Sequence, residues 1–143
     1  MTVLVDTTVW SLALRRRSHQ LASEEKGLVE HWADLVISRR AVLTGPIRQE
    51  ILSGIRSGDV FVALQEKLST FPYLEILPDD YDQAARFFNH CRAGGISGSN
   101  VDMLICATAH RYGVPIFTTD PDFPLYAQHI PIRLHEPPSS PTH

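Results

Sequence analysis

Four acidic residues stand where a folded chain could bring carboxylates together in one cleft. Asp6 and Asp120 each follow a short apolar run of the kind that forms a buried strand, whereas Asp102 and Glu50 fall in the first two turns of expected helices. Carboxylates that share a cleft of low dielectric constant repel one another strongly. Bound divalent cations, uptake of protons or separation in space could each offset that repulsion.

Bound cations would give the cluster a catalytic role. Carboxylate oxygens are hard ligands and suit Mg²⁺ or Mn²⁺. Such ions turn a water molecule into a nucleophile and neutralise phosphate charge during an in-line displacement. Acids in this pattern would therefore allow cleavage of a phosphodiester bond without a nucleophile from the protein.

Each acid also has a purely structural interpretation. Asp6 could cap the helix that follows it, and Asp102 could complement the dipole of its own helix. Glu50 could be a solvated side chain, and Asp120 and Asp122 could form a turn. Spacing alone leaves these alternatives open.

Short apolar strands alternate with amphipathic helices along the chain. Strands are expected at 3–5, 41–43 and 115–118, with further candidates at 74–77 and 130–134. Helices are expected at about 7–14, 23–36, 45–54, 60–68, 81–91 and 100–109. This alternation predicts an α/β fold with parallel strand pairing and helices on both faces of the sheet. The site of such a sheet lies beyond the carboxyl ends of its strands, where Asp6 and Asp120 fall.

The composition fits a single folded domain with a short tail. The chain has 143 residues, and the domain is expected at residues 1–135. Because hydrophobic residues make up 43% of the chain, a substantial core can form. The proline-rich segment 136–143 is expected to be disordered. The formal net charge of −3 means that any contact with nucleic acid would depend on a local basic patch.

The sequence also favours a cytoplasmic protein with no membrane association. No stretch is long and apolar enough to span a bilayer, and the first ten residues lack the basic region and cleavage site of a signal peptide. Cys91 and Cys106 form no metal-binding spacing with each other or with a nearby histidine, which predicts two ordinary thiols.

Three local motifs resemble those of VapC-type PIN domains. The segment 3–10, VLVDTTVW, resembles their opening strand, which ends in Asp before small hydroxyl residues. The segment 101–109, VDMLICATA, resembles their Asp followed by an alanine-rich helix, and 117–123, FTTDPDF, resembles their last motif. Glu50 falls where the family places its helical glutamate. The resemblance covers the chain apart from the proline-rich tail, although segment 57–89 matches no motif.

The resemblance implies a fold, a metal site and an activity. The fold would be a three-layer α/β/α sandwich with a central, mainly parallel sheet. The activity would be that of an endoribonuclease dependent on Mg²⁺ or Mn²⁺. The ion would be held by Asp6, Asp102 and Asp120, with Glu50 completing the acidic set. Asp122 would be a possible fifth acid, and Thr118 would support the cluster from the second shell of residues.

The resemblance further implies that the protein is a toxin neutralised by a small VapB-type antitoxin, and that it forms a homodimer. Large apolar residues on the early helices are compatible with a partner groove, although plain core packing explains each of them as well. They are Trp10, Leu14, Trp32 and Phe61.

Two segments near the acids could contact an RNA substrate. Arg15, Arg16 and Arg17 lie one short helix away from Asp6, and arginine binds phosphate through a planar fork of donors. A solvated helix end explains them equally well. The flexible loop before Asp102 could contact phosphate or ribose through its backbone and three side chains. They are Ser97, Ser99 and Asn100.

Three other functions compete with this interpretation. A phosphatase of the haloacid dehalogenase type needs a second Asp two residues after the first, and Thr8 stands there. A receiver-like signalling module needs a Lys after a late strand, and no Lys follows Lys67. A PIN-like module that grips RNA or a partner without cutting would not need its acids intact.

Overall fold

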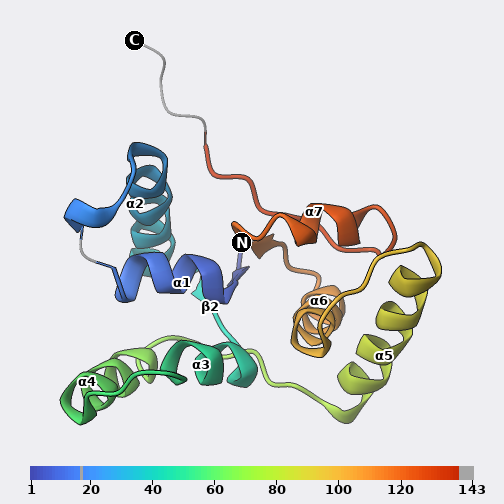
Figure 1. Cartoon of the computed structure of the whole chain (residues 1–143), viewed down its shortest axis with the longest axis horizontal. Coiled ribbons are helices and arrows are strands. Elements are labelled where there is room, and N and C mark those ends of the chain that lie inside the picture. Colours follow the sequence, from blue (N-terminus) through green and yellow to red (C-terminus); the bar gives the residue numbers. More distant parts are fainter. Residues whose placement is uncertain (17, 139–143) are drawn as a thin grey trace.

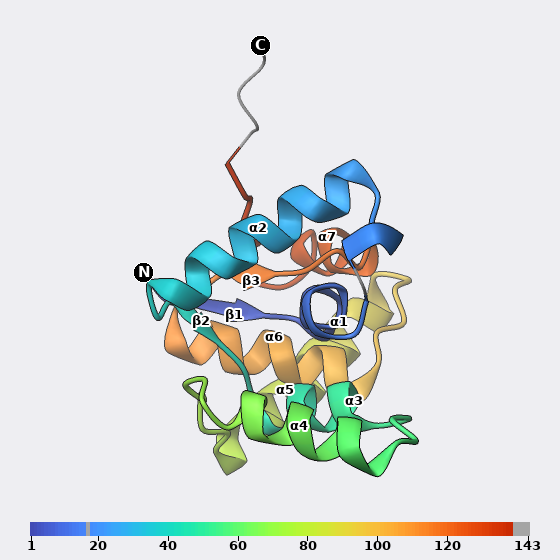
Figure 2. The same ribbon diagram turned by 90° about the vertical axis from the view of Figure 1, so that its left-hand side faces the viewer.

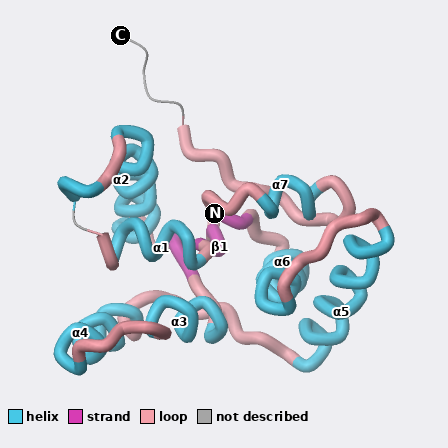
Figure 3. The backbone as a smooth tube through the Cα atoms, viewed as in Figure 1, coloured by secondary structure: helices cyan, strands magenta, loops and turns pink. Residues whose placement is uncertain are grey.

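The computed structural model describes residues 1–16 and 18–138 (Figure 1). Its sheet has three parallel strands in the order β2–β1–β3, with β1 (Val3–Val5) between β2 (Ala41–Val42) and β3 (Ile116–Phe117). Leu4 pairs with Val42 on one side and with Ile116 on the other. The expected parallel pairing is therefore confirmed, and β1 is the centre of the fold (Figure 3).

Helices cover both faces of this sheet. All three residues of β1 are buried, as a strand covered on both faces requires. In Figure 2, α2 (Ser23–Ile37) lies above the strands, and α6 (Asn100–Tyr112) and α5 (Pro78–Ala93) lie below them. The predicted three-layer α/β/α sandwich is confirmed. No helix of residues 1–16 and 18–138 has the length and apolar character needed to cross a membrane.

The remaining helices lie around the sheet and its two covering layers, and α4 packs against α3. The helix α1 packs between α2 and α3 (Figure 1). The bounds of these elements are α1 (Thr7–Leu14), η1 (Ser18–Gln20), α3 (Gly45–Leu52), α4 (Gly58–Leu68) and α7 (Asp122–Ala127). The short helix α7 was not expected from the sequence, because Pro124 interrupts its pattern.

Two of the apolar residues considered for a partner groove lie in the core instead. Trp10 is fully buried, and its indole Nε1 donates to the carbonyl of Val5 at 2.8 Å. Its ring packs edge-on against Trp32, with 5.6 Å between centroids, and at a tilt against Phe71, with 4.8 Å between centroids. This cluster joins α1 to α2, so the groove interpretation is wrong for Trp10 and Trp32. Leu14 is partly buried and lines a separate groove with α4.

The two further strand candidates are wrong as strands: 74–77 contains no bridge, the nearest being at Tyr73, and 130–134 contains a single one. Leu43 pairs with Tyr73, and Ile116 pairs with Leu134. The backbone of 75–77 is taken by side chains: the carbonyl of Glu75 accepts from Arg111 and from Tyr112. Pro131 cannot donate to a ladder, so the start of the other candidate does not pair and its bridge forms only at Leu134. Sequence periodicity could not reveal that side chains would occupy the backbone hydrogen-bonding groups that a strand at 75–77 needs.

An ion pair between the buried carboxylate of Asp80 and the exposed Arg111 joins α5 to α6. The Arg111 guanidinium donates to both carboxylate oxygens of Asp80, at 2.7 and 3.0 Å, and Asp80 also accepts from the amide of Leu77. Burial acts to raise the pKa of Asp80, but these hydrogen bonds outweigh it and leave that pKa below its usual value. The pair anchors the two helices beneath the sheet.

The segment after β3 returns to α2 through a pair of histidines. The Nε2 atoms of His31 and His135 are 2.7 Å apart, and the rings stack with an interplanar angle of 7°. The ring of Phe117 meets both at an edge. Beyond this contact the chain has no regular structure as far as Pro138, and the rest of the predicted disordered tail lies outside the described residues.

Because of this pair, we expect the protein to lose stability on mild acidification. Burial lowers the pKa of both His31 and His135; Arg40 lowers both further, and Asp34 partly opposes the shift at His31. A histidine with a lowered pKa stabilises the fold above its unfolded pKa of about 6.5 and loses that contribution as the pH falls through the folded value.

Melting temperatures between about pH 8 and pH 5 test this expectation. The variant His135→Gln should show a shallower fall with pH than the wild type, whereas the exposed His90→Gln should follow the wild type. Identical pH profiles for wild type and His135→Gln would contradict the assignment of this pH dependence to the histidine pair.

Candidate functional site

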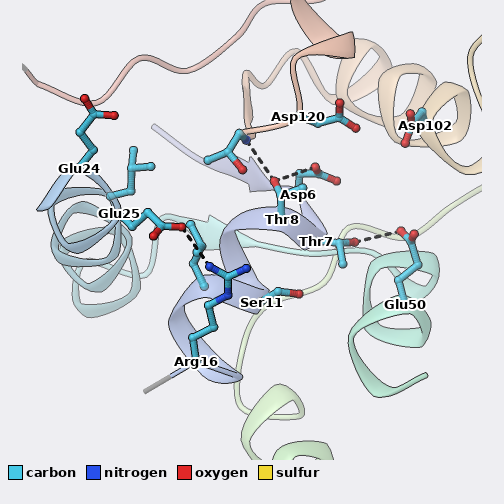
Figure 4. A pocket seen from close by; sticks show the side chains of 13 residues that line it. Asp6, Thr7, Thr8, Ser11, Arg16, Glu24, Glu25, Glu50, Asp102 and Asp120 are labelled. Carbon is cyan, nitrogen blue, oxygen red and sulfur yellow. Dashed lines mark hydrogen bonds and ion pairs between the residues drawn. The ribbon is translucent and has the colours of Figure 1, made fainter. Parts of the chain in front are cut away.

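The four predicted acids line a single cleft, although they come from four different elements. Asp6 follows β1 and Asp120 follows β3, while Glu50 lies on α3 and Asp102 in the first turn of α6. The cleft has a volume of about 610 Å³ and opens beyond the carboxyl ends of β1 and β3 (Figure 4). The structure therefore brings together the residues whose positions suggested a common site.

Asp6 is fixed in this cleft by two hydroxyl groups. Its side chain is buried, and its Oδ2 accepts hydrogen bonds from Thr118 at 2.8 Å and from Thr8 at 3.1 Å. Asp6 occupies the N-cap position of α1, but its carboxylate makes no capping hydrogen bond there. The interpretation of Asp6 as a simple helix cap is therefore wrong.

The same two hydroxyl groups position the loop that carries Asp120. The Oγ1 of Thr118 accepts from the amide of Asp120 at 3.0 Å, and the Oγ1 of Thr8 accepts from the amide of Thr119 at 3.1 Å. Each threonine thus donates to Asp6 and accepts from the loop after β3. This reciprocal arrangement holds the ends of β1 and β3 in register. It also places Thr118, which the family resemblance implied as a support of the acidic cluster, against Asp6.

Asp102 is held from both its backbone and its side chain. Ser99 caps α6 by accepting from the amide of Asp102 at 3.0 Å. The hydroxyl of Tyr126, on α7, donates to Asp102 Oδ2 at 2.7 Å. No pattern in the sequence indicated a role for Tyr126, because α7 itself was not expected.

Glu50 is the most exposed of the four acids and has a hydroxyl partner too. Thr7 Oγ1 donates to Glu50 Oε1 at 2.9 Å, which links α1 to α3 across the cleft (Figure 4). Sequence reasoning treated Thr7 and Thr8 only as helix-start residues. Their position directly after Asp6 was the signal for a role in the cluster, because the first turn of a helix lies beside the residue that precedes it.

The cluster is electrostatically unfavourable without a cation. Burial is the largest effect that raises the pKa of Asp6; the hydrogen bonds from Thr118, Thr7 and Thr8 oppose it, and the charge of Asp120 adds to it. Burial likewise raises the pKa of Asp102, where the Tyr126 hydrogen bond opposes the shift and the charges of Asp6 and Asp120 increase it. Both ionised carboxylates would therefore gain from a nearby positive charge.

The protein itself supplies little positive charge to the cleft. Besides the four acids, Glu24 and Glu25 of α2 line it. Of the described residues, Arg16 is the one cation in the lining, and its Nη1 is paired with Glu25 at 3.2 Å (Figure 4). Asp6, Glu50, Asp102 and Asp120 carry hydroxyl or amide partners, which orient a carboxylate without neutralising it.

Several other residues considered for the site lie elsewhere. Asp122 is exposed at the start of α7, and its amide donates to Asp120 Oδ1 at 2.9 Å, so these two acids do form a turn. Arg15 lines the separate groove between α1 and α4, and Asn100 lines a pocket between α5 and α6. Ser97 is exposed outside the lining of the cleft.

The six residues proposed for RNA contact therefore do not lie together in one site. The structure places Arg16 in the cleft and uses the Ser99 hydroxyl as a helix cap. Arg17 lies outside the described residues. RNA contact by any of these residues stays a prediction.

The donor set of the cleft fits a hard divalent cation. Four carboxylates supply oxygen ligands, and two of them have pKa values raised partly by mutual repulsion. Within residues 1–16 and 18–138, no three acidic, histidine or cysteine side chains are close enough to enclose an ion as they stand. Binding would thus require the carboxylates to rotate toward one another.

Comparisons with known proteins agree with the fold and with the motifs. Residues 3–128 match the family model of the PIN domain. Ribonuclease VapC11 of Mycobacterium tuberculosis is 29% identical over 128 residues, which cover 88% of this chain and 92% of the relative.

Solved structures show the same fold. The sarcin-ricin loop cleaving toxin VapC20 of Mycobacterium tuberculosis is similar with a TM-score of 0.68 at 20% identity, over 92% of this chain and 99% of that one. A toxin-antitoxin complex from Klebsiella pneumoniae gives 0.61 at 18% identity, over 83% and 87%. Since the family model spans most of the sequence, from β1 to the end of α7, the chain belongs to the PIN domain family.

Proposed function

We propose that this protein is a VapC-type ribonuclease toxin that cleaves RNA phosphodiester bonds with Mg²⁺ or Mn²⁺. The observation that carries the proposal is the convergence of Asp6, Glu50, Asp102 and Asp120 on one cleft. A cluster of carboxylates with so little neutralising charge is suited to binding a hard cation and, through it, a phosphate group. The name of VapC11 as a ribonuclease supports this choice of reaction.

The ion would be held by Asp6, Asp102 and Asp120, and Glu50 would complete the acidic set. When bound, a divalent cation activates water and neutralises charge on the phosphate. The chain's own contribution is orientation: the hydroxyl groups of Thr8 and Thr118 hold Asp6 while they fix the loop of Asp120. Rigid placement of ligands is what limits the reorganisation needed during a reaction.

Arg16 is the best placed of the predicted RNA-contacting residues. Its guanidinium lies at the edge of the same cleft and is held by Glu25, whose other carboxylate oxygen accepts from the amide of Ala22. The latter contact fixes Glu25 to the start of α2. Arg16 could take an RNA phosphate next to the scissile bond, as an exposed guanidinium does through its paired donors.

The toxin role follows from the same relatives. VapC20 is named as a toxin, and the Klebsiella pneumoniae structure as a toxin-antitoxin complex. We extend this to a VapB-type antitoxin as the partner of this chain, and the predicted homodimer belongs to the same proposal. Membership of the PIN family leaves no support for the receiver-like module or the phosphatase. A binding module that does not cut is an outcome of the test below.

Expression of the chain in bacteria tests the proposal directly. We expect growth arrest and new RNA 5′ and 3′ ends that map to one or a few sites. We also expect a short reading frame immediately upstream of its gene, whose co-expression relieves the arrest. Harmless expression of folded protein, without new RNA ends, would contradict the toxin role. Growth arrest without new ends, accompanied by RNA bound to the purified protein, would identify a non-cleaving module.

A further inference from the structure

The contact between Tyr126 and Asp102 lies outside the motifs that define the cleft. The Tyr126 hydroxyl donates to Asp102 Oδ2 at 2.7 Å, a short distance for a hydrogen bond to a carboxylate. Tyr126 is at the C-terminal end of α7, does not line the cleft and is 1% exposed. A buried tyrosine hydroxyl needs a polar partner, and this one is directed at a cleft acid.

The ring of Tyr126 has little freedom to move. Its neighbour Phe123 packs against it edge-on, with 5.2 Å between ring centroids. On the side of the loop before α6, a Cβ added to Gly98 would stand 3.2 Å from Tyr126 Cε1 and 2.6 Å from Met103 Cε. A side chain at this position would press on the ring, so glycine favours the close approach of the backbone. The position of the hydroxyl is thereby set by packing on both sides.

Asp102 needs such a fixed partner more than Asp6 does. Asp6 is buried and accepts hydrogen bonds from Thr8 and Thr118. Asp102 is only half-buried at the start of α6, where its carboxylate can rotate toward solvent. The bond from Tyr126 fixes one carboxylate oxygen and so limits that rotation.

The helix α7 connects two of the cleft acids. At its start, the Oδ1 of Asp120 accepts from the amide of Asp122, and the carbonyl of Asp120 accepts from the amide of Phe123 at 3.2 Å. At its end, Tyr126 reaches Asp102. This short helix therefore fixes the position of Asp120 relative to Asp102. No strand of the described sheet makes that connection.

We infer that Tyr126 is a positioning residue that orients the Asp102 carboxylate for binding a divalent cation. The inference rests on the proposed function, because it assigns Asp102 to the metal site. Residues that hydrogen-bond to a metal ligand affect the affinity for the metal. Their loss weakens metal binding or activity by about 10- to 100-fold. The role is structural support of a ligand and involves no contact with RNA.

Direct titration of the purified protein with Mn²⁺, followed by electron paramagnetic resonance in the absence of RNA, tests the inference. Tyr126→Phe removes the hydroxyl and keeps the ring, so the variant should fold and bind Mn²⁺ about 10- to 100-fold more weakly than the wild type. The matched control is Tyr112→Phe, which removes a hydroxyl that donates at 2.9 Å to the carbonyl of Glu75, outside the cleft lining. Its Mn²⁺ affinity should equal that of the wild type.

The outcomes separate this inference from the proposed function. If the wild type binds Mn²⁺ and a folded Tyr126→Phe binds it equally well, the positioning role is overturned while the metal-dependent ribonuclease proposal stands. Equal weakening in both tyrosine variants would also overturn it, because a general effect on stability would then explain the loss. If the wild type itself does not bind Mn²⁺, the metal proposal fails and this inference fails with it.

Discussion

Replacing Asp6 with Asn should lower RNA cleavage by at least about 1,000-fold while leaving the protein folded. Asp6 is the most buried of the four cleft acids, and both of its threonine partners position it as a ligand. Asparagine keeps the size of the side chain but removes its charge. Loss of several kcal/mol of charge stabilisation in the transition state, at about 1.4 kcal/mol for each tenfold, corresponds to a decrease of this size.

The same substitution should not destabilise the metal-free protein, and we expect it to raise the melting temperature. Burial and the charge of Asp120 both raise the pKa of Asp6, so its ionised form is less favourable in the folded chain than in the unfolded chain. A neutral side chain removes that disadvantage. Opposite effects on activity and stability are typical of residues selected for function and not for folding.

Cleavage rates and melting temperatures of purified proteins check both parts. Asp82→Asn on α5 is the control, since Asp82 is exposed and lies outside the cleft lining, and it should retain activity. Cleavage by a folded Asp6→Asn variant at the wild-type rate would remove Asp6 from the catalytic set. A large drop in melting temperature would instead show that Asp6 serves the fold.

The location of the acidic cluster could be predicted because the sheet is parallel. The carboxyl ends of parallel strands meet at one edge, so residues directly after β1 and β3 had to be neighbours. That rule places Asp6 and Asp120 without any knowledge of side-chain geometry. Asp102 and Glu50 needed the motif resemblance as well, because the rotation of a helix about its axis is decided by packing.

The partners of the acids were beyond the reach of sequence patterns. Thr8 and Thr118 are 110 residues apart and share Asp6 only because β1 pairs with β3. Tyr126 lies on a helix whose pattern is broken by Pro124, so neither the element nor its contact with Asp102 could be anticipated. Long-range hydrogen bonds of single side chains leave no periodic trace in a sequence.

The RNA-binding candidates show a second limit. Three successive arginines after α1 suggested one basic patch, but successive residues around a helix end point in different directions. Arg16 enters the acidic cleft, whereas Arg15 lines the groove toward α4. Proximity in sequence to Asp6 was therefore a weak guide to proximity in space.

Removing divalent cations should abolish cleavage, and adding Mg²⁺ or Mn²⁺ should restore it. The cleft contains six carboxylates among its described lining residues, while its described cation, Arg16, is already paired with Glu25. A negatively charged RNA backbone would be repelled from such a surface unless a cation intervened. Cleavage that persists after treatment with EDTA and dialysis would point to a different chemistry.

The effect of the cation on stability should depend on pH in a defined direction. Asp6 and Asp102 have raised pKa values, so protonation stabilises the metal-free fold at low pH, and that contribution is lost as the pH rises through the raised values. At neutral pH, Mg²⁺ at about 100 times its dissociation constant should restore about 2.7 kcal/mol, because it binds only the folded cleft. At about pH 4 the gain should be smaller, since protonation of Asp6 and Asp102, whose pKa values are raised, competes with binding of the ion.

Thermal unfolding with and without Mg²⁺, at both pH values, distinguishes a specific site from general screening of charge. The wild type should gain stability at neutral pH, and Asp6→Asn should gain much less, although it changes the net charge by only one unit. NaCl at the same ionic strength should not reproduce the gain in stability, because salt screens buried charges only weakly. An equal gain in stability for Asp6→Asn and the wild type would mean that the ion binds outside this cleft. Asp6 would then not hold a catalytic cation.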